Sequence, residues 1–321
     1  MGRRPSDALA RRWDGRPARL EVWYATLSDP GSGLGCWIHH EHVAPVAGAP
    51  FAHGWTAVFR PGTDPVLERF GPGPVRTGGP DGALSAAGGA VLDPPRLHGA
   101  AGRCRWDLRW EETGPEGGTP PTLFTFPAWA WDRDVLPAAQ VVPAPSTPFA
   151  GSIRVDDEEI ALSPGARGGV SHIYGHGNAQ RWGWLHADLG AGDVLEIVSA
   201  VSRRPGMRRL PPLAFVQLRL GGRDWPRDPL AAAPLFHTEL GLPSWRVRGT
   251  VGRWRLRVEV TIPSADAVRV GYVDPDGAGA TCTNSERADA DIVLERRRAV
   301  WEVAARWSLR AGAHAEIGTR P

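Results

Sequence analysis

The residues between 171 and 189 combine imidazole, carboxylate, phenol and indole side chains more densely than any other stretch of the chain. Alternate residues of an extended strand point to the same face. This periodicity places two indoles, an imidazole and a carboxylate together: Trp182, Trp184, His186 and Asp188. A histidine beside a carboxylate can hold or move a proton near neutral pH, and indole faces stabilise positive charge. The pattern indicates a lined pocket that could protonate an alkene or enolise a carbonyl.

A second alternating set precedes this face and is loosened by Gly175 and Gly177. It contains His172, Tyr174, His176 and Asn178. We interpret the titratable side chains of both sets as candidate catalytic groups: His172, His176, His186 and Asp188. The remaining polar and aromatic side chains are candidate ligand-binding groups: Tyr174, Asn178, Trp182 and Trp184. The alternative is a barrel strand whose polar groups are satisfied at a seam between domains.

Glu21 is the candidate acid of an earlier strand, in which it shares a face with Trp23. A carboxyl group among bulky side chains would have its pKa raised by desolvation. The alternative is an exposed glutamate at a sheet edge, or one paired with an arginine. Trp23 and Tyr24, which point to opposite faces, are candidate ligand contacts.

Three histidines and a glutamate follow in the next strand, where Trp37, His39 and Glu41 share one face. The opposite face holds His40 and His42, whose spacing would suit a shared zinc ion. No third ligand stands at a useful spacing, so we predict no metal and interpret these side chains as lining a cavity. Trp37 and His39 are included among the ligand contacts.

A polar cluster after a predicted turn, residues 272–286, contains Asn284 as a further candidate ligand contact. Its alternative interpretation is a β-turn followed by a helix cap, with a short helix over 285–291. No glycine-rich phosphate loop follows a strand and opens a helix. The sequence therefore predicts no nucleotide and no other cofactor.

The charge balance is nearly neutral, with 37 basic and 35 acidic residues. This balance gives no reason to expect nucleic acid as a partner. No stretch approaches the ~18 apolar residues of a membrane span, so we predict no membrane insertion. The amino terminus lacks the apolar run of a signal peptide. The three cysteines form neither a C-x-x-C pair nor a disulfide framework. That usage favours the cytoplasm.

The elements that must position these groups are short strands, because 40 glycines and 31 prolines leave few windows for helices. We predict an all-β protein of two antiparallel barrels packed together. Three prolines within six residues near 145 predict an extended connector. The expected division is an N-terminal extension (1–18), a first barrel (19–142), a Pro-rich linker (143–150) and a second barrel (151–321).

Three features resemble one known superfamily. The opening Glu21-Val22-Trp23-Tyr24 is similar to the E-x-W-Y start of the lipocalin-like AttH and carotenoid 1,2-hydratase (hydroxyneurosporene synthase) superfamily. The Pro-rich crossover resembles that superfamily's passage into its second domain. The segment from His172 to Asn178, followed by Trp182-x-Trp184, resembles its Y-H-D-H-N-W-G and W-x-W-G motifs. The aspartate between the two histidines of the motif is absent here, so hydratase activity is not carried over.

The resemblance implies two lipocalin-like (calycin-type) barrels with a ligand between them. Relatives in the superfamily include tocopherol cyclases and Diels–Alderases, which share an apolar polyene or isoprenoid substrate. The implied function is binding of a hydrophobic isoprenoid- or polyketide-like molecule. The implied reaction is a cofactor-free hydration, cyclisation or isomerisation, which makes the protein a lyase or isomerase. The alternatives are a non-catalytic carrier of a lipophilic metabolite and a structural protein with a vestigial pocket.

Overall fold

The computed structural model describes residues 8–75, 83–112, 122–126, 129, 131 and 137–321. The chain divides into two units at Gly177, where the motif with the clustered histidines ends. Unit 1 holds the described residues of Met1–Phe124, Trp129–Gly177 and Val273–Ala278. Unit 2 holds those of Thr125–Ala128, Asn178–Tyr272 and Gly279–Pro321. No helix among the described residues is long and apolar enough to cross a membrane.

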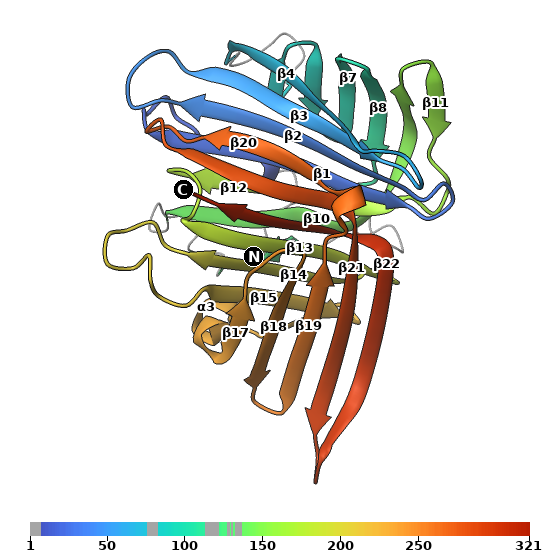
Figure 1. Ribbon diagram of the computed structural model, residues 1–321, viewed down its shortest axis with the longest axis vertical. Helices are drawn as coiled ribbons and strands as arrows, with labels where there is room; N and C mark the ends of the chain where they lie inside the picture. The colour runs from blue at the N-terminus through green and yellow to red at the C-terminus, as the bar shows by residue number, and fades with distance from the viewer. Residues whose placement is uncertain (1–7, 76–82, 113–121, 127–128, 130, 132–136) are drawn as a thin grey trace. The chain divides into compact units, whose positions relative to one another are not determined.

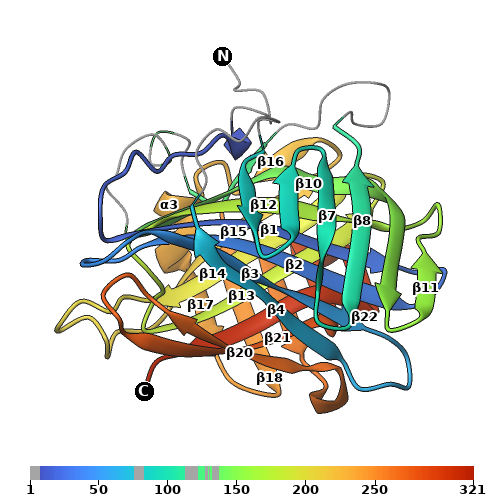
Figure 2. The same ribbon diagram turned by 90° about the horizontal axis from the view of Figure 1, so that it is seen from above.

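Unit 1 is built on a curled antiparallel sheet in the order β4-β3-β2-β1-β12-β10-β8-β7-β6-β5, with β9 and β11 paired to β10. Figure 2 shows β1 to β4 side by side, and β5, at the far edge of the sheet, lies against β3 and β4. Its strands are β1 (Arg19–Asp29), β2 (Leu34–Ala44), β3 (Phe51–Phe59), β4 (Val66–Pro74), β5 (Ser85–Ala87), β6 (Ala90–Asp93), β7 (Arg96–Ala101), β8 (Cys104–Trp110), β9 (Leu123–Phe124), β10 (Ala138–Val155), β11 (Glu158–Ala161) and β12 (Arg167–Gly175).

Unit 2 has a second antiparallel sheet in the order β16-β15-β14-β13-β22-β21-β19-β18-β17, with β20 paired to β21. β15 lies against β17, so this sheet also curls. Its elements are β13 (Arg181–Gly190), β14 (Asp193–Val201), β15 (Leu213–Leu220), β16 (Arg223–Trp225), α3 (Pro229–Ala232), η1 (Ala233–Leu235), β17 (Phe236–Glu239), β18 (Ser244–Val251), β19 (Trp254–Thr261), η2 (Ser264–Asp266), β20 (Val268–Val273), β21 (Gly279–Arg297) and β22 (Trp301–Thr319).

The two sheets confirm the predicted all-β class with two lipocalin-like antiparallel units. The helix predicted over 285–291 is wrong, because these residues belong to β21. In β21 the apolar residues Ala288, Ala290 and Ile292 alternate toward the core and pair with β22. The two-residue alternation of apolar side chains therefore determines the structure here, and the local signal for a helix cap does not.

The predicted division between the domains also differs from the structure. The expected linker, residues 143–150, lies inside β10, which pairs with β12 and then with β8. Proline fixes an extended φ but donates no ladder hydrogen bond. The β10–β12 register accordingly shifts between Val141 and Ala144 and again before Thr147, beside Pro143 and Pro145. A Pro-rich composition thus marks an irregular strand here, and β11 and β12 belong to unit 1.

Gly54 in β3 allows the strand to pass close to its neighbours. A Cβ at this position would stand 1.9 Å from the His39 carbonyl oxygen and 2.3 Å from the Phe70 ring. Because the backbone at His39 cannot move away without an energetic cost, we expect Gly54→Ala to lower the free energy of unfolding by about 1–3 kcal/mol. Gly73→Ala in β4, where a Cβ meets nothing within 4 Å, is the control. Equal urea midpoints for the two variants would contradict this packing.

Candidate functional site

The interior face of unit 1 carries a patch of polar and aromatic side chains where β1 pairs with β2 and β12. Glu21 stands opposite His42 on one side and Tyr174 on the other. Trp23 stands opposite His40 and His172 in the same two ladders. The three strands thus bring together six buried side chains, which we call the interior patch: Glu21, Trp23, His40, His42, His172 and Tyr174.

Glu21 and His172 form a fully buried pair in this patch, with 2.9 Å between Glu21 Oε1 and His172 Nε2. The backbone N–H groups of Arg12 and Trp13 donate to the two Glu21 oxygens at 2.5 and 3.0 Å. Burial alone would raise the Glu21 pKa, but the hydrogen bond and charge of His172 and these two donors outweigh it and lower the pKa. The expected rise in this pKa is therefore wrong, and Glu21 is a carboxylate.

His172 faces a hydrogen-bond acceptor at each ring nitrogen. Its Nδ1 is 2.7 Å from the Ala8 carbonyl oxygen, and its Nε2 faces the ionised Glu21. A carbonyl and a carboxylate can only accept, so this geometry favours a ring in which both nitrogens donate. Trp23 stacks on this ring at 4.9 Å and Trp131 meets it edge-on at 4.9 Å. Both indoles are thus placed to stabilise the positive charge.

His40 and His42 share one hydroxyl group. The Ser85 Oγ is 3.2 Å from His40 Nδ1 and 3.0 Å from His42 Nε2. Burial lowers the pKa of His40 to about 3 and that of His42 to about 4. Both rings are therefore neutral at physiological pH, beside the Glu21–His172 pair, and neutral imidazoles can accept protons.

Three buried polar atoms of the interior patch have no hydrogen-bond partner among the described residues: His40 Nε2, His42 Nδ1 and the Tyr174 hydroxyl. Buried polar groups are nearly always hydrogen-bonded in native proteins, and each exception calls for an explanation. Three such atoms around one ion pair are available to a polar group of a bound molecule.

The N-terminal segment covers the patch, although the sequence suggested only an extension over 1–18. Ala8 and Leu9 are buried. The Ala8 carbonyl accepts from His172 and the Leu9 carbonyl accepts from the Trp23 indole at 2.8 Å. The Arg12 guanidinium lies 4.5 Å from the centre of the Tyr174 ring. Residues 8–13 therefore complete the site with backbone groups that side-chain patterning cannot predict.

The other predicted contacts of unit 1 lie on the opposite face of the same strands. Tyr24 and Trp37 pack against His39, with ring centres 5.4–5.5 Å apart. Glu41 accepts from His39 Nε2 at 2.9 Å and lies 3.6 Å from His53 Nε2. Burial opposes the charge of Glu41, but the two histidines lower its pKa to about 2. This is a separate buried cluster, which Trp23 and Glu21 do not join.

His186 is bound to Glu196 in unit 2, across the β13–β14 ladder, rather than to the predicted partner Asp188, which acts on it through charge. Its Nδ1 lies 2.5 Å from Glu196 Oε1, while the Trp184 indole donates to Glu196 Oε2 at 2.8 Å. Burial opposes a charge on His186, but the carboxylates of Glu196, Asp188 and Glu286 raise its pKa. Asp188 instead accepts the Gly190 N–H at 2.9 Å in the turn that ends β13.

Trp182 and Asn284 meet at Glu316 in the same unit. The Trp182 indole donates to Oε1 at 2.6 Å and the Asn284 amide to Oε2 at 3.3 Å. Burial raises the Glu316 pKa. Nearby, His314 stacks edge-on against Trp184 at 4.5 Å and bonds Glu286 at 2.7 Å.

Two of the predicted residues, His176 and Asn178, lie outside the interior patch of unit 1 and outside the groups around Glu196 and Glu316 in unit 2. His176 follows the end of β12, where its Nδ1 lies 2.9 Å from an Arg19 guanidinium nitrogen. Asn178 opens unit 2, and its backbone carbonyl accepts from Arg320 at 3.1 Å. The alternation that grouped them with His172 and Tyr174 ends with β12 at Gly175. No group of three potential ligands among the described residues is arranged to hold a metal ion.

The sequence also missed several residues of these clusters, because their positions depend on long-range pairing and loop packing: Ser85, Trp131, Glu196, Glu286, His314 and Glu316. The signal that could have found Glu196 and Glu316 is their place opposite His186 and Trp184 in neighbouring strands. Such pairing requires the strand register to be known.

Comparison with known proteins links this architecture to a family. A family model described as tocopherol cyclase-like matches residues 127–319. The chain is 47% identical over 314 residues to the uncharacterized protein Rv0493c of Mycobacterium tuberculosis strain H37Rv, covering 98% of this chain and 90% of that protein.

Three solved structures share the fold at low sequence identity. They are CghA with Sch210972 (TM-score 0.59, 14% identity, 94% of this chain and 88% of that one), AttH (NE1406) of Nitrosomonas europaea (0.55, 14%, 94% and 92%), and kievitone hydratase of Nectria haematococca (0.53, 11%, 92% and 88%). Together with the tocopherol cyclase-like family match, these shared folds confirm the predicted superfamily.

Proposed function

We propose, since the chain belongs to the tocopherol cyclase-like family, that it is an enzyme acting without a cofactor on a hydrophobic isoprenoid- or polyketide-like molecule. The proposed reactions are hydration, cyclisation or isomerisation of an alkene. The sequence placed the ligand between two barrels, and that placement stays a prediction. The site we propose lies within unit 1, at the interior patch.

One observation carries this proposal: a buried histidine with a hydrogen-bond acceptor at each ring nitrogen stands beside neutral imidazoles and unpartnered polar atoms. Charge inside an apolar core is costly, and the Glu21–His172 pair is enclosed by indoles. A proton donor, His172, and two proton acceptors, His40 and His42, therefore occupy one water-poor face. Sites that keep neighbouring groups in opposite protonation states are suited to acid–base catalysis.

The chemistry that follows needs no reagent other than water. His172 gives its proton to one alkene carbon, whose π electrons form the new C–H bond. The adjacent carbon becomes positive, and the faces of Trp23 and Trp131 stabilise it. Addition of water gives hydration, addition of a hydroxyl group of the same molecule gives cyclisation, and loss of another proton gives isomerisation. His42 takes the released proton.

Access to His172 requires a movement of the N-terminal segment. The Ala8 carbonyl is bonded to the His172 Nδ1–H, and the Leu9 carbonyl accepts from the Trp23 indole N–H. We infer that a ligand displaces these two residues, while Arg12 and Trp13 keep Glu21 ionised.

Deuterium labelling tests the proposal. The protein is incubated in deuterium oxide with a panel of isoprenoid and polyketide-like alkenes, and products are analysed by mass spectrometry. Each of the three reactions places one solvent deuterium on carbon. We expect His172→Gln to reduce this incorporation by a factor of about 100 or more while ligand affinity changes only a few fold.

Tyr24→Phe is the matched control, because Tyr24 lies on the opposite face of β1 and should leave turnover unchanged. Ligand binding without deuterium incorporation by the wild-type protein would contradict the enzyme proposal. That outcome would support the alternative carrier function.

A further inference from the structure

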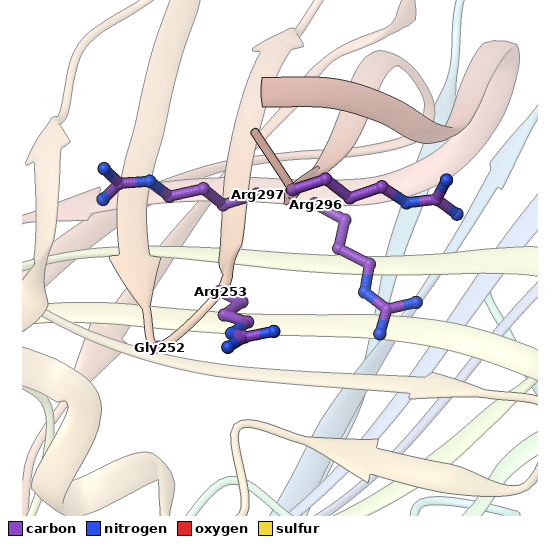
Figure 3. A pocket seen from close by; sticks show the side chains of 5 residues that line it. Gly252, Arg253, Arg296 and Arg297 are labelled. Atoms are coloured by element: carbon purple, nitrogen blue, oxygen red, sulfur yellow. The ribbon is translucent and has the colours of Figure 1, made fainter. Parts of the chain in front are cut away.

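A group of arginines lies where two hairpins of unit 2 end beside each other. Trp254 in β19 stands opposite Arg296 in β21, and the Arg297 N–H donates to the Arg253 carbonyl at 2.8 Å. Figure 1 shows the β21–β22 hairpin extending past the β18–β19 turn. Four exposed arginines with Gly252 line a hollow of about 590 Å³ between these turns: Arg253, Arg296, Arg297 and Arg298 (Figure 3). We call this group the arginine tip.

Little acidic charge opposes the arginine tip. Within the part of the chain that the structure describes, Arg253, Arg296 and Arg297 form no ion pair. The nearby Glu295 forms ion pairs with Arg255 at 2.6 Å and Arg257 at 3.3 Å. Residues 251–257 and 294–303 together hold six arginines and two glutamates, an excess larger than the +2 of the whole chain. These two segments therefore form a strongly positive part of the surface.

Apolar and aromatic side chains adjoin these arginines. Val300 and Val303 are 66% and 53% exposed, and Trp254 and Trp301 are half-buried. The guanidinium of Arg296 lies 5.4 Å from the Trp254 ring centre, and that of Arg255 lies 4.6 Å from that of Trp301. Tryptophan and arginine are the side chains that best tolerate the boundary between hydrocarbon and lipid head groups.

We propose that the arginine tip binds the surface of a membrane containing anionic phospholipids. Val300 and Trp301 enter the head-group region, and the arginines contact lipid phosphates. Figure 3 shows the labelled arginine side chains extending in different directions, which suits phosphates spread over a surface better than one bound anion. One face of each tryptophan already holds a guanidinium group, which leaves less indole surface for stacking on nucleic-acid bases, and the exposed valines favour lipid.

Vesicle flotation tests this binding with the full-length protein. Vesicles of phosphatidylcholine alone are compared with vesicles containing about one-third phosphatidylglycerol. We expect binding to the anionic vesicles only, weakening as salt rises. Replacing Arg253, Arg296 and Arg297 by glutamine should weaken the partition about 100-fold, at roughly fivefold for each arginine. Val300→Ser, which keeps the charge, should weaken it about five- to tenfold.

A control triple variant removes the same charge from exposed arginines of unit 1: Arg105→Gln, Arg109→Gln and Arg154→Gln. It should bind the vesicles like the wild type. Equal loss in both triple variants would overturn the proposal, because net charge alone would then explain the binding. Binding to a nucleic-acid duplex but not to anionic vesicles would also overturn it.

Discussion

Replacing Glu21 by glutamine is expected to lower the free energy of unfolding by about 3–5 kcal/mol, because the change breaks a buried pair by removing the carboxylate that faces His172. The amide also cannot replace both carboxylate oxygens. One oxygen can accept from Arg12 and His172, but the amide nitrogen then faces the Trp13 N–H, donor against donor. The same change should abolish turnover. Urea unfolding followed by tryptophan fluorescence measures the first effect.

Glu159→Gln provides the matched control for this variant. Glu159 is also paired with a cation, Arg154 at 2.6 Å, but its side chain is 51% exposed. Exposed pairs of this kind contribute at most about 1 kcal/mol, so the control should unfold near the wild-type urea concentration. If Glu21→Gln were as stable as Glu159→Gln, the buried ion pair would not exist as described.

The second large effect is loss of stability in mild acid. Burial lowers the pKa of His40 to about 3 and those of His42 and His314 to about 4. The unfolded chain therefore binds more protons than the folded one between these values and about 6.5. Stability is full above pH 6.5 and falls as the pH drops, by about 1.4 kcal/mol per pH unit for each histidine and roughly 4 for all three.

Glu316 opposes this slope, because its raised pKa lets the folded state hold one proton above about 4.5, but one proton does not cancel the three of the histidines. The raised pKa of His186 stabilises the folded state below pH 6.5 and loses that contribution only as the pH rises above it. The lowered pKa values of Glu21 and Glu41 add to the acid loss only below about 4.5.

Urea unfolding at stepped pH measures the slope. His40→Gln should reduce the slope by about 1.4 kcal/mol per pH unit, which is the contribution of one proton. His237→Gln, at a side chain 55% exposed, should leave the slope unchanged. A stability independent of pH between 4.5 and 6.5 would contradict the burial of neutral histidines.

The strand faces could be read from the sequence, because side chains alternate strictly in β1, β2 and β13. Glu21 with Trp23, and His40 with His42, share faces as predicted. The pairing of Glu21 with His172 could not be predicted, because it depends on β12 lying beside β1, 151 residues away in the chain. The sequence instead assigned His172 to the second domain.

Local signals also misled where tertiary contacts outweighed them. The prolines near 145 looked like a linker but lie at irregular positions of β10. The near-neutral charge of the whole chain concealed the arginine tip, because ladder register alone brings Arg253 beside Arg296 and Arg297. Backbone acceptors such as the Ala8 carbonyl have no sequence signature.

The most direct test of the central claim is the protonation state of His172 at neutral pH. Long-range proton–nitrogen NMR distinguishes an imidazolium from either neutral tautomer, and the His172→Gln variant assigns the signal. We expect both His172 ring nitrogens to carry a proton in the wild type and Glu21→Gln to return the ring to a neutral form. A single protonated nitrogen in the wild type would contradict the proposed interior acid.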